Sequence, residues 1–216
     1  MSDKSKDVID QLVGVLPGSA LDTVRHGRPT ARDNAQKSYE ALFAPLDAST
    51  VLLEERFAIA YFVAALHQDE AIAAFYREQL GHHDRNGLIG AISAEIRRGT
   101  TVGPYGHYPA GPLSAEGKPG LEYQPDAANR QVLGRLGAAL AHAHFLVFRP
   151  RDASPDKLQQ LLDAGWSTTD IVTLSQLVAF LAFQIRVVIG LRALAAAQQA
   201  TSVAHASTPI SPVAAA

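Results

Sequence analysis

The chain has 216 residues, which fits one domain, or one domain with extensions, and is long enough to bury a sizeable core. Its 19 lysines and arginines face 21 aspartates and glutamates, for a formal net charge of -2, without a basic cluster that could neutralise phosphates, so no nucleic acid partner is expected. Cysteine is absent, which excludes disulfides, thiolate nucleophiles and cysteine-ligated metal sites.

The first residues, MSDKSKDVID, lack the charged-then-apolar pattern of a secretory signal. We therefore expect a cytoplasmic location. Residues 1–29 are assigned to an N-terminal extension, and residues 30–199 to a helical domain.

Helical segments separated by capping signals follow from there, and no convincing alternation of period two occurs. Thr30 with Asp33 begins a helix that runs to about Phe43, and the apolar helix LLEERFAIAYFVAALHQ follows Pro45. Asp69 is expected to cap a shorter helix that ends at Gly81.

Four more helices complete the pattern. NGLIGAISAEIRR ends at Gly99, and DAANRQVLGRLGAALAHAHFLVF ends before Pro150. Ser154 followed by proline is an N-cap with proline at the first helical position, and Ser167 with Asp170 makes a capping box for the last helix. The fold class is all-α, a helical bundle.

Two segments interrupt this pattern. Residues 99–125 hold six glycines and five prolines, so they predict a long loop, which is either functional or disordered. Residues 200–216 are of low complexity and predict a disordered tail.

Residues 174–194, LSQLVAFLAFQIRVVIGLRAL, are almost apolar enough to cross a bilayer. Arg186 lies near the middle, where an arginine costs about 2.5 to 3.5 kcal/mol on insertion-derived scales. Arg192 lies about 120° from it around the helix, so one cavity face could not easily shelter both. The segment is therefore interpreted as a helix buried inside a soluble, oligomeric protein and not as a membrane span.

The segment LQQLLDAGWSTTDIVTLSQLVAFLAFQIRVVIGLRAL, with LLEERFAIAYFVAALHQDEAIAAFYREQL upstream, resembles the carboxymuconolactone decarboxylase superfamily, which includes the alkylhydroperoxidase D-like proteins. The matching features are a short helix, the turn at Gly165, Trp166 and Ser167, and a long helix with Arg186 in its second half. The resemblance implies an all-helical fold that assembles into trimers or hexamers, with small-molecule pockets near the subunit contacts.

The peroxidases of that superfamily carry Glu-x11-Cys-x2-Cys-x3-His. Laid on this pattern, the chain has Phe57 at the glutamate, Asp69 and Ile72 at the cysteines, and Tyr76 at the histidine. Because no sulfur nucleophile is present, thiol peroxidase activity is not expected. Asp69 is explained more simply as the cap of the following helix, although its position also makes it a candidate ligand-binding residue.

Candidate catalytic residues are histidines and a tyrosine. His67 ends the helix that, by resemblance, leads into the family's active site, although a histidine is also favoured there by the helix dipole. Tyr76 could donate a hydrogen bond to a substrate, or could be packing. His107 lies between Tyr105 and Tyr108 in the glycine- and proline-rich loop, which suits a lid over a pocket or an arm around a neighbouring subunit.

The candidate ligand-binding residues are Asp69, Tyr105, Tyr108, His142 and Arg186. His142 and His144 are about 200° apart on a helix, so they cannot jointly bind one metal, and no metal site or cofactor is predicted. One of the two is expected in a helix interface and the other on the surface. Arg186 could hold a carboxylate substrate or pair with Glu54 or Glu55.

Two functions fit these observations. The first is thiol-independent acid–base chemistry on, or binding of, a small organic molecule. The second is a non-catalytic helical oligomer or binding protein in oxidative or xenobiotic metabolism. A cavity lined by at least two of His67, Tyr76, His107 and Arg186 would favour the enzyme, and one beside Asp69 displaced toward Tyr76 is the expected place.

Overall fold

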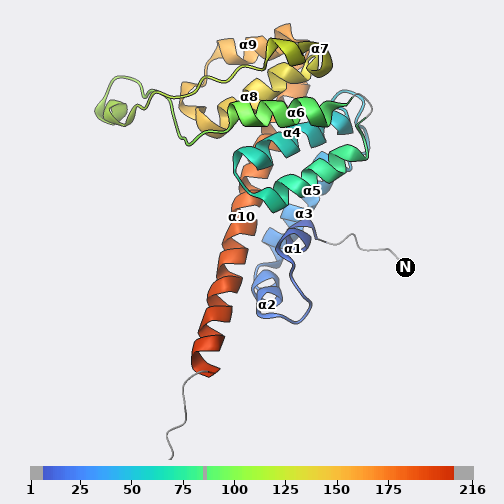
Figure 1. Cartoon of the computed structure of the whole chain (residues 1–216), viewed down its shortest axis with the longest axis vertical. Coiled ribbons are helices and arrows are strands. Elements are labelled where there is room, and N and C mark those ends of the chain that lie inside the picture. The colour runs from blue at the N-terminus through green and yellow to red at the C-terminus, as the bar shows by residue number, and fades with distance from the viewer. Residues whose placement is uncertain (1–6, 85–86, 207–216) are drawn as a thin grey trace, which may run out of the picture.

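The computed structural model describes residues 7–84 and 87–206, with side chains to residue 200. These residues form an all-α fold, with no β-strand among them (Figure 1). Its elements are α1 (Val8–Val13), α2 (Ala20–His26), α3 (Pro29–Phe43), α4 (Leu53–Leu66), α5 (Glu70–Gly81), α6 (Leu88–Gly99), η1 (Pro112–Glu116), η2 (Ala127–Asn129), α7 (Arg130–Leu133), α8 (Leu136–Phe148), η3 (Pro150–Asp152), α9 (Pro155–Asp163) and α10 (Thr168–Ala206).

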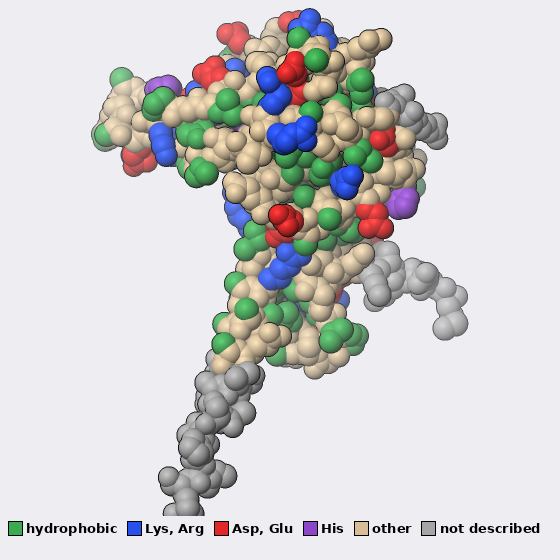
Figure 2. Space-filling model, in the orientation of Figure 1, with side chains coloured by type: hydrophobic (Ala, Val, Ile, Leu, Met, Phe, Trp, Pro, Cys, Tyr) green, Lys and Arg blue, Asp and Glu red, His purple; other side chains and the backbone are tan. Residues whose placement is uncertain are grey.

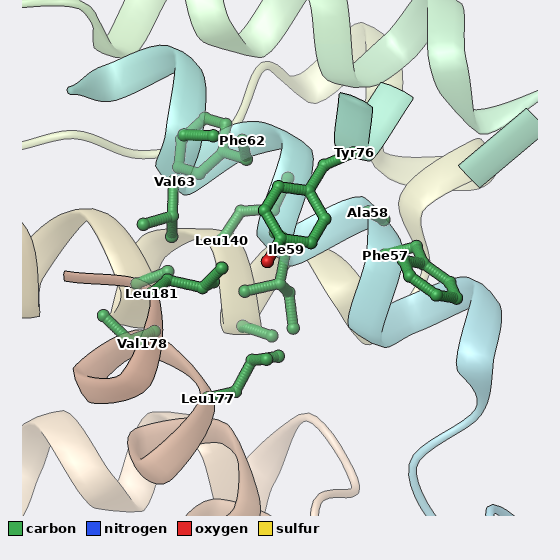
Figure 3. Close-up of a cluster of buried hydrophobic side chains, with 14 of the residues drawn as sticks. Phe57, Ala58, Ile59, Phe62, Val63, Tyr76, Leu140, Leu177, Val178 and Leu181 are labelled. Atoms are coloured by element: carbon green, nitrogen blue, oxygen red, sulfur yellow. The ribbon is translucent and has the colours of Figure 1, made fainter. Parts of the chain in front are cut away.

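Helix α4 is the centre of the core, and α3, α5, α6, α8 and α10 pack around it. Its sequence, LEERFAIAYFVAAL, is apolar on nearly every side, as a helix surrounded by others requires. Figure 3 shows Phe57, Ile59, Phe62 and Val63 from this helix meeting Leu140 of α8 and Leu177 and Leu181 of α10.

The two short N-terminal helices are held by a network of ion pairs. Arg25 of α2 binds both Asp7 and Asp10 of the α1 region, at 2.9 and 2.6 Å, and Arg32 of α3 binds the same two carboxylates. This network holds α1 in place, and Val8 belongs to the same buried core as α4. The part of the expected N-terminal extension that is described, residues 7–29, therefore packs as part of the helical body.

Several of the predicted capping interactions are confirmed. The Asp69 carboxylate accepts a 2.9 Å hydrogen bond from the Ile72 N–H at the start of α5. At the start of α10, the Ser167 hydroxyl accepts from the Asp170 N–H and the Asp170 carboxylate accepts from the Ser167 N–H. Helix α3 begins one residue before the expected position, because Pro29 takes the first helical position.

The expected single helix over residues 126–148 is wrong. The segment begins with η2 and α7, stops at Gly134, and resumes as α8. Gly134 has φ 51° and ψ -132°, a backbone conformation that side-chain-bearing residues rarely adopt. This glycine separates α7 from α8.

Helix α10 is less enclosed than its apolar sequence predicts. Residues Thr168–Ala200 have a mean hydropathy of 1.9, so the helix is long and apolar enough to cross a membrane by length and composition, yet only 39% of its most apolar stretch is buried. Its C-terminal part extends beyond the helical body (Figure 1). On the face seen in Figure 2, this part of the helix carries mostly uncharged side chains.

The glycine- and proline-rich loop over residues 99–125 projects from one side of the body, with η1 near its tip (Figure 1). Gly106 and Lys118 form an isolated antiparallel bridge at its base, with hydrogen bonds of 2.9 Å in both directions. Of the predicted tail, the backbone of residues 201–206 continues α10, and residues 207–216 lie outside the described residues.

Candidate ligand-binding site

A cavity of about 430 Å³ opens where α7, α8 and α9 meet the segment that precedes η2. We call it the α8 cavity, because residues of α8 form much of its lining. Its walls include Tyr123, Pro125, Arg130, Leu133, Gly137, Ala138, Ala141, His142, His144, Phe145, Arg149, Lys157 and Gln160.

Small side chains on α8 leave the space for this cavity. Gly137 and Ala141 are four residues apart, as are Ala138 and His142, so each pair shares a face of the helix, and all four residues line the cavity. The break at Gly134 tilts α8 away from the direction of α7 and places the first turn of α8 at the cavity. The sequence LGAALAHAH therefore combines an apolar helix with room for a ligand beside it.

His142 is the polar group of the floor. Its side chain is 6% exposed, and Nε2 lies 3.1 Å from the Ser175 hydroxyl oxygen on α10. Nδ1 is buried and has no hydrogen-bond partner among the described residues. Burial lowers the pKa of His142, so the ring is neutral at pH 7, with one nitrogen as donor and the other as acceptor.

His144 is part of the cavity wall. Its Nε2 lies 2.9 Å from the Gly99 carbonyl oxygen, which can only accept, so this nitrogen carries the proton. The ring stacks on Tyr123 with 4.8 Å between the ring centres. Both histidines of the pair are therefore buried, and the expectation that one lies on the surface is wrong.

A buried carboxylate fixes the segment that covers the cavity. Glu95 of α6 is fully buried and accepts hydrogen bonds from the Tyr123 hydroxyl at 2.8 Å, the Asp126 N–H at 3.0 Å and the Asn129 side-chain amide at 2.6 Å. Burial and the bond to Glu95 together raise the pKa of Tyr123, so it stays a hydrogen-bond donor at any physiological pH.

The cavity has basic side chains at its edge. Arg149 already has acidic partners within the protein, because its guanidinium forms ion pairs with Asp152 at 2.7 Å and with Glu122 at 3.1 Å. Arg130 of α7 and Lys157 of α9 form no ion pair within the described residues. Lys157 only approaches the Phe145 ring, at 5.9 Å from its centre. Two cations are thus available to an anionic group of a ligand.

The structure places the other predicted site residues elsewhere. His67 ends α4, where Nδ1 lies 2.9 Å from the Val63 carbonyl oxygen of the same helix. Asp69 caps α5 and also binds Arg192 at 2.9 Å. Neither residue lines the α8 cavity or the second cavity described below, and the Asp69–Arg192 ion pair lies at the helix junction that the sequence suggested.

Tyr76 is packed in the core. Its ring is fully buried, next to the Ile59, Leu140 and Leu181 side chains drawn in Figure 3, and its hydroxyl donates a hydrogen bond to the Gln184 side-chain oxygen. Burial raises the pKa of Tyr76 well above its usual value. The hydroxyl is therefore used inside the protein and does not reach either cavity.

The three loop residues contact the end of α8 and η3 and do not cover a pocket. The Tyr105 hydroxyl lies 2.7 Å from the Thr101 hydroxyl, and its N–H donates to the Phe148 carbonyl at 2.6 Å. The N–H of His107 donates to the Asp152 carboxylate at 2.8 Å, and Arg151 lies 4.4 Å from the centre of the Tyr108 ring. The end of the same loop, at Tyr123 and Pro125, lines the α8 cavity, whereas these three residues do not line it.

Arg186 is exposed, and its guanidinium donates a 2.8 Å hydrogen bond to the Ala182 carbonyl of its own helix. Of its two expected acidic partners, Glu54 and Glu55, Glu55 instead binds Arg135 at 2.7 Å. Gln184, on the same helix, is buried and accepts a hydrogen bond from Tyr76.

A second, more open cavity of about 420 Å³ lies between α4, α5 and α6, where Tyr61, Ala73 and Ile89 contribute to its wall. No predicted site residue lines it. Among the residues that the structure describes, no group of three or more histidines, aspartates or glutamates is arranged to hold a metal ion.

His142 is thus the predicted residue that the structure places in a cavity, and Arg130 and Lys157 are the ones that sequence reasoning missed. They come from two short helices, α7 and α9, that lie on either side of α8 in the chain. The available signal was the run of small residues on one side of α8. Comparisons of the chain with protein-family models, with curated proteins and with solved structures found no match.

Proposed function

We propose that this protein binds a small organic anion in the α8 cavity. The observation that carries the proposal is the His142 imidazole in the cavity floor, with one nitrogen held by Ser175 and the other without a protein partner. A buried polar atom without a partner is costly, and Nδ1 has almost no exposed surface in this structure. We therefore expect a small movement of the cavity wall to admit a water molecule or a ligand group that completes it. Arg130 and Lys157 supply the charge that would attract a carboxylate.

The chemistry proposed for this site is proton transfer without a thiol. A neutral histidine can accept a proton from a bound molecule, and the Ser175 contact orients the ring while it does so. This proposal keeps the function suggested by the resemblance to the carboxymuconolactone decarboxylase superfamily, acid–base chemistry on a small organic acid or lactone. It moves the site from the α4–α5 junction to α8.

The test is a thermal-shift screen of small mono- and dicarboxylates against the parent chain and His142→Ala. We expect a ligand that stabilises the parent and does not stabilise the variant. His67→Ala is the matched control, because His67 is also a half-buried histidine with a lowered pKa but lies outside both cavities. Equal ligand stabilisation of the parent and His142→Ala would contradict the proposal.

Charge reversal tests the cationic edge separately. Arg130→Glu combined with Lys157→Glu should weaken binding of a carboxylate at least tenfold and should remove its dependence on salt concentration. Arg77→Glu, at the second cavity, is the control and should leave the affinity unchanged.

The proposal also predicts that the protein has no thiol-dependent peroxidase activity. With no cysteine in the chain, consumption of an organic hydroperoxide in the presence of a dithiol reductant should not exceed that of heat-inactivated protein. Turnover above that control would be incompatible with the assignment of a thiol-independent site.

The second candidate function, a helical oligomer without catalysis, is favoured by the exposed apolar side chains of α10, Val172, Phe183, Ile189 and Leu194. Such a surface is typical of a contact between subunits. We propose self-association, with a trimer or hexamer as the expected assembly. Light scattering that gives a mass of 23.0 kDa at micromolar concentration would contradict it.

A further inference from the structure

One side of α10 is exposed along most of the helix, and its exposed positions follow a regular pattern. From Val172 to Ala197 they recur at alternating steps of four and three residues, the spacing of a helix that packs along another helix. We call this row the α10 seam. All eight of its side chains are exposed: Val172, Gln176, Ala179, Phe183, Arg186, Gly190, Ala193 and Ala197.

The opposite side of α10 faces the protein. Leu174, Leu177, Leu181 and Val188 are buried in the core. Farther along, Arg192 binds Asp69 and the Leu12 carbonyl oxygen on this same side. The protein body therefore lies behind the helix when it is viewed from the seam, and it does not obstruct the seam.

We infer that the α10 seam binds the α10 seam of a second copy of this chain in an antiparallel pair. This inference deepens the proposed self-association and rests on it. The seam is symmetric about a point between residues 184 and 185, so an antiparallel copy places every seam position opposite another seam position. The facing pairs are Val172 with Ala197, Gln176 with Ala193, Ala179 with Gly190, and Phe183 with Arg186.

Each of these layers suits the pairing. In the two outer layers Val172 and Gln176 each face an alanine, so a larger residue meets a small one there. Ala179 faces Gly190, beside which a Cβ would meet nothing within 4 Å, so two backbones can approach closely there. A pattern of large against small residues is self-complementary, as a twofold contact requires.

In the central layer, formed by Phe183 and Arg186, charge favours the antiparallel register. The Phe183 side chain is 47% exposed, and the exposed Arg186 guanidinium donates a hydrogen bond to its own helix. In the antiparallel register each Arg186 faces the partner's Phe183, where a guanidinium over an aromatic ring is favourable. A parallel register would instead place the two Arg186 cations opposite each other.

The same arginine argues against a lipid bilayer as the occupant. Arg186 lies in the middle of the exposed apolar side, where insertion would carry its charge to the centre of the hydrocarbon layer. A second copy satisfies this charge and covers the apolar side chains on both sides of the seam, including Ile189 and Leu194. The pair is a twofold contact, which is complete as a dimer and also occurs within a hexamer.

Cysteine cross-linking tests the register directly, because the chain has no cysteine of its own. Ala179→Cys and Gly190→Cys are prepared as single variants of the full chain, then mixed and oxidised. The antiparallel pair predicts a disulfide-linked dimer in the mixture and little in either variant alone. Two copies of residue 179 would lie about 16 Å apart along the helices, beyond the roughly 7 Å limit for a disulfide.

The possible outcomes test the antiparallel seam separately from the proposed self-association. A dimer formed by Ala179→Cys alone would indicate a parallel register and overturn the inference. An oligomeric parent in which the mixture forms no cross-link would show that the chain associates through another surface. A monomeric parent would overturn both the seam and the proposed self-association.

A charge in the seam gives an independent readout. Phe183→Glu should convert the parent oligomer to a smaller species at unchanged helix content by circular dichroism. Leu46→Glu, a fully exposed apolar residue outside α10, is the matched control and should keep the parent's mass. Sedimentation of a monomeric parent with phosphatidylcholine and phosphatidylglycerol vesicles, abolished by Phe183→Glu, would replace the second copy by a membrane surface.

Discussion

At the scale of single residues, the candidate active-site tyrosine is a structural one. Tyr76 and Gln184 are both fully buried, and each satisfies the other through one hydrogen bond between α5 and α10. The Gln184 side-chain nitrogen has no partner among the described residues. This pair therefore links two helices while leaving part of the amide unsatisfied, which makes it a sensitive point of the core.

Removing one member of the Tyr76–Gln184 hydrogen bond should lower the free energy of unfolding more than replacing both members. Tyr76→Phe leaves the Gln184 oxygen without its donor, and we expect the free energy of unfolding to fall by about 1 to 3 kcal/mol. Tyr76→Phe combined with Gln184→Met replaces the pair by apolar groups of similar shape and should recover most of that loss. Denaturant titration measures both, and a double variant less stable than Tyr76→Phe would contradict this explanation.

Asp69 has two structural roles that substitution can separate. Asp69→Ala removes both the α5 cap, worth about 1 kcal/mol, and the ion pair with Arg192, worth up to about 1 kcal/mol more at this partly exposed site. Asp69→Asn keeps an equally good cap and should show only the smaller loss. If Asp69→Ala unfolded at the same temperature as the parent but lost ligand binding, the residue would belong to a functional site.

At the scale of elements, the glycine between α7 and α8 sets the shape of the cavity. Gly134→Ala should lower the free energy of unfolding by about 1 to 3 kcal/mol, since alanine is strained at φ 51° and ψ -132°. Gly90→Ala is the control of opposite sign. Gly90 lies inside α6 with open space beside it, so alanine there should stabilise the helix by about 0.5 to 1 kcal/mol. Equal effects at both positions would mean that Gly134 has no special conformation.

Helix positions could be predicted because capping and periodicity are local. The hydrogen bonds of Asp69 with Ile72 and of Ser167 with Asp170 join residues three apart, and the sequence places them side by side. The interruption at Gly134 was missed because a glycine inside an apolar helical pattern is also tolerated without a break. Whether the helix breaks at this glycine depends on the packing of α8 against α4 and α10, and the local sequence does not show that packing.

Site residues were harder to predict because a site depends on which helices meet. His67, Tyr76 and Asp69 lie within ten residues of one another, yet one bonds its own helix, one is in the core and one is held by Arg192. His142 was a candidate, but its contact with Ser175 spans 33 residues and its cavity neighbours come from α7 and α9. Arg186 and Arg192 were equally plausible polar residues of α10, and only the fold decides which one faces Asp69.

At the scale of the whole molecule, two buried histidines and the half-buried His67 link stability to pH. Burial lowers the pKa of His67, His142 and His144. Nearby arginines, Arg186 for His67 and Arg149 for His144, lower the pKa further, while backbone hydrogen bonds oppose the effect of burial on these two. The native chain therefore resists protonation at three sites that the unfolded chain leaves open.

The sign of the resulting pH dependence follows from these shifts. Above the unfolded-state pKa of about 6.5, all three histidines are neutral in both states and their contribution to stability is fully present. As the pH falls below 6.5, the unfolded chain binds protons that the native chain does not, so the free energy of unfolding decreases until the native pKa values are reached. Each histidine can contribute a slope of up to about 1.4 kcal/mol per pH unit in this window.

We expect urea denaturation between pH 7.5 and about pH 5 to show this loss, because carboxylate protonation, which begins nearer pH 4, adds little above that limit. His142→Gln should reduce the slope by removing one of the three groups, whereas His82→Gln, at the exposed end of α5, should leave it unchanged. A parent chain whose free energy of unfolding is constant from pH 7.5 to pH 5 would mean that these histidines are protonated as readily in the native protein as in the unfolded chain.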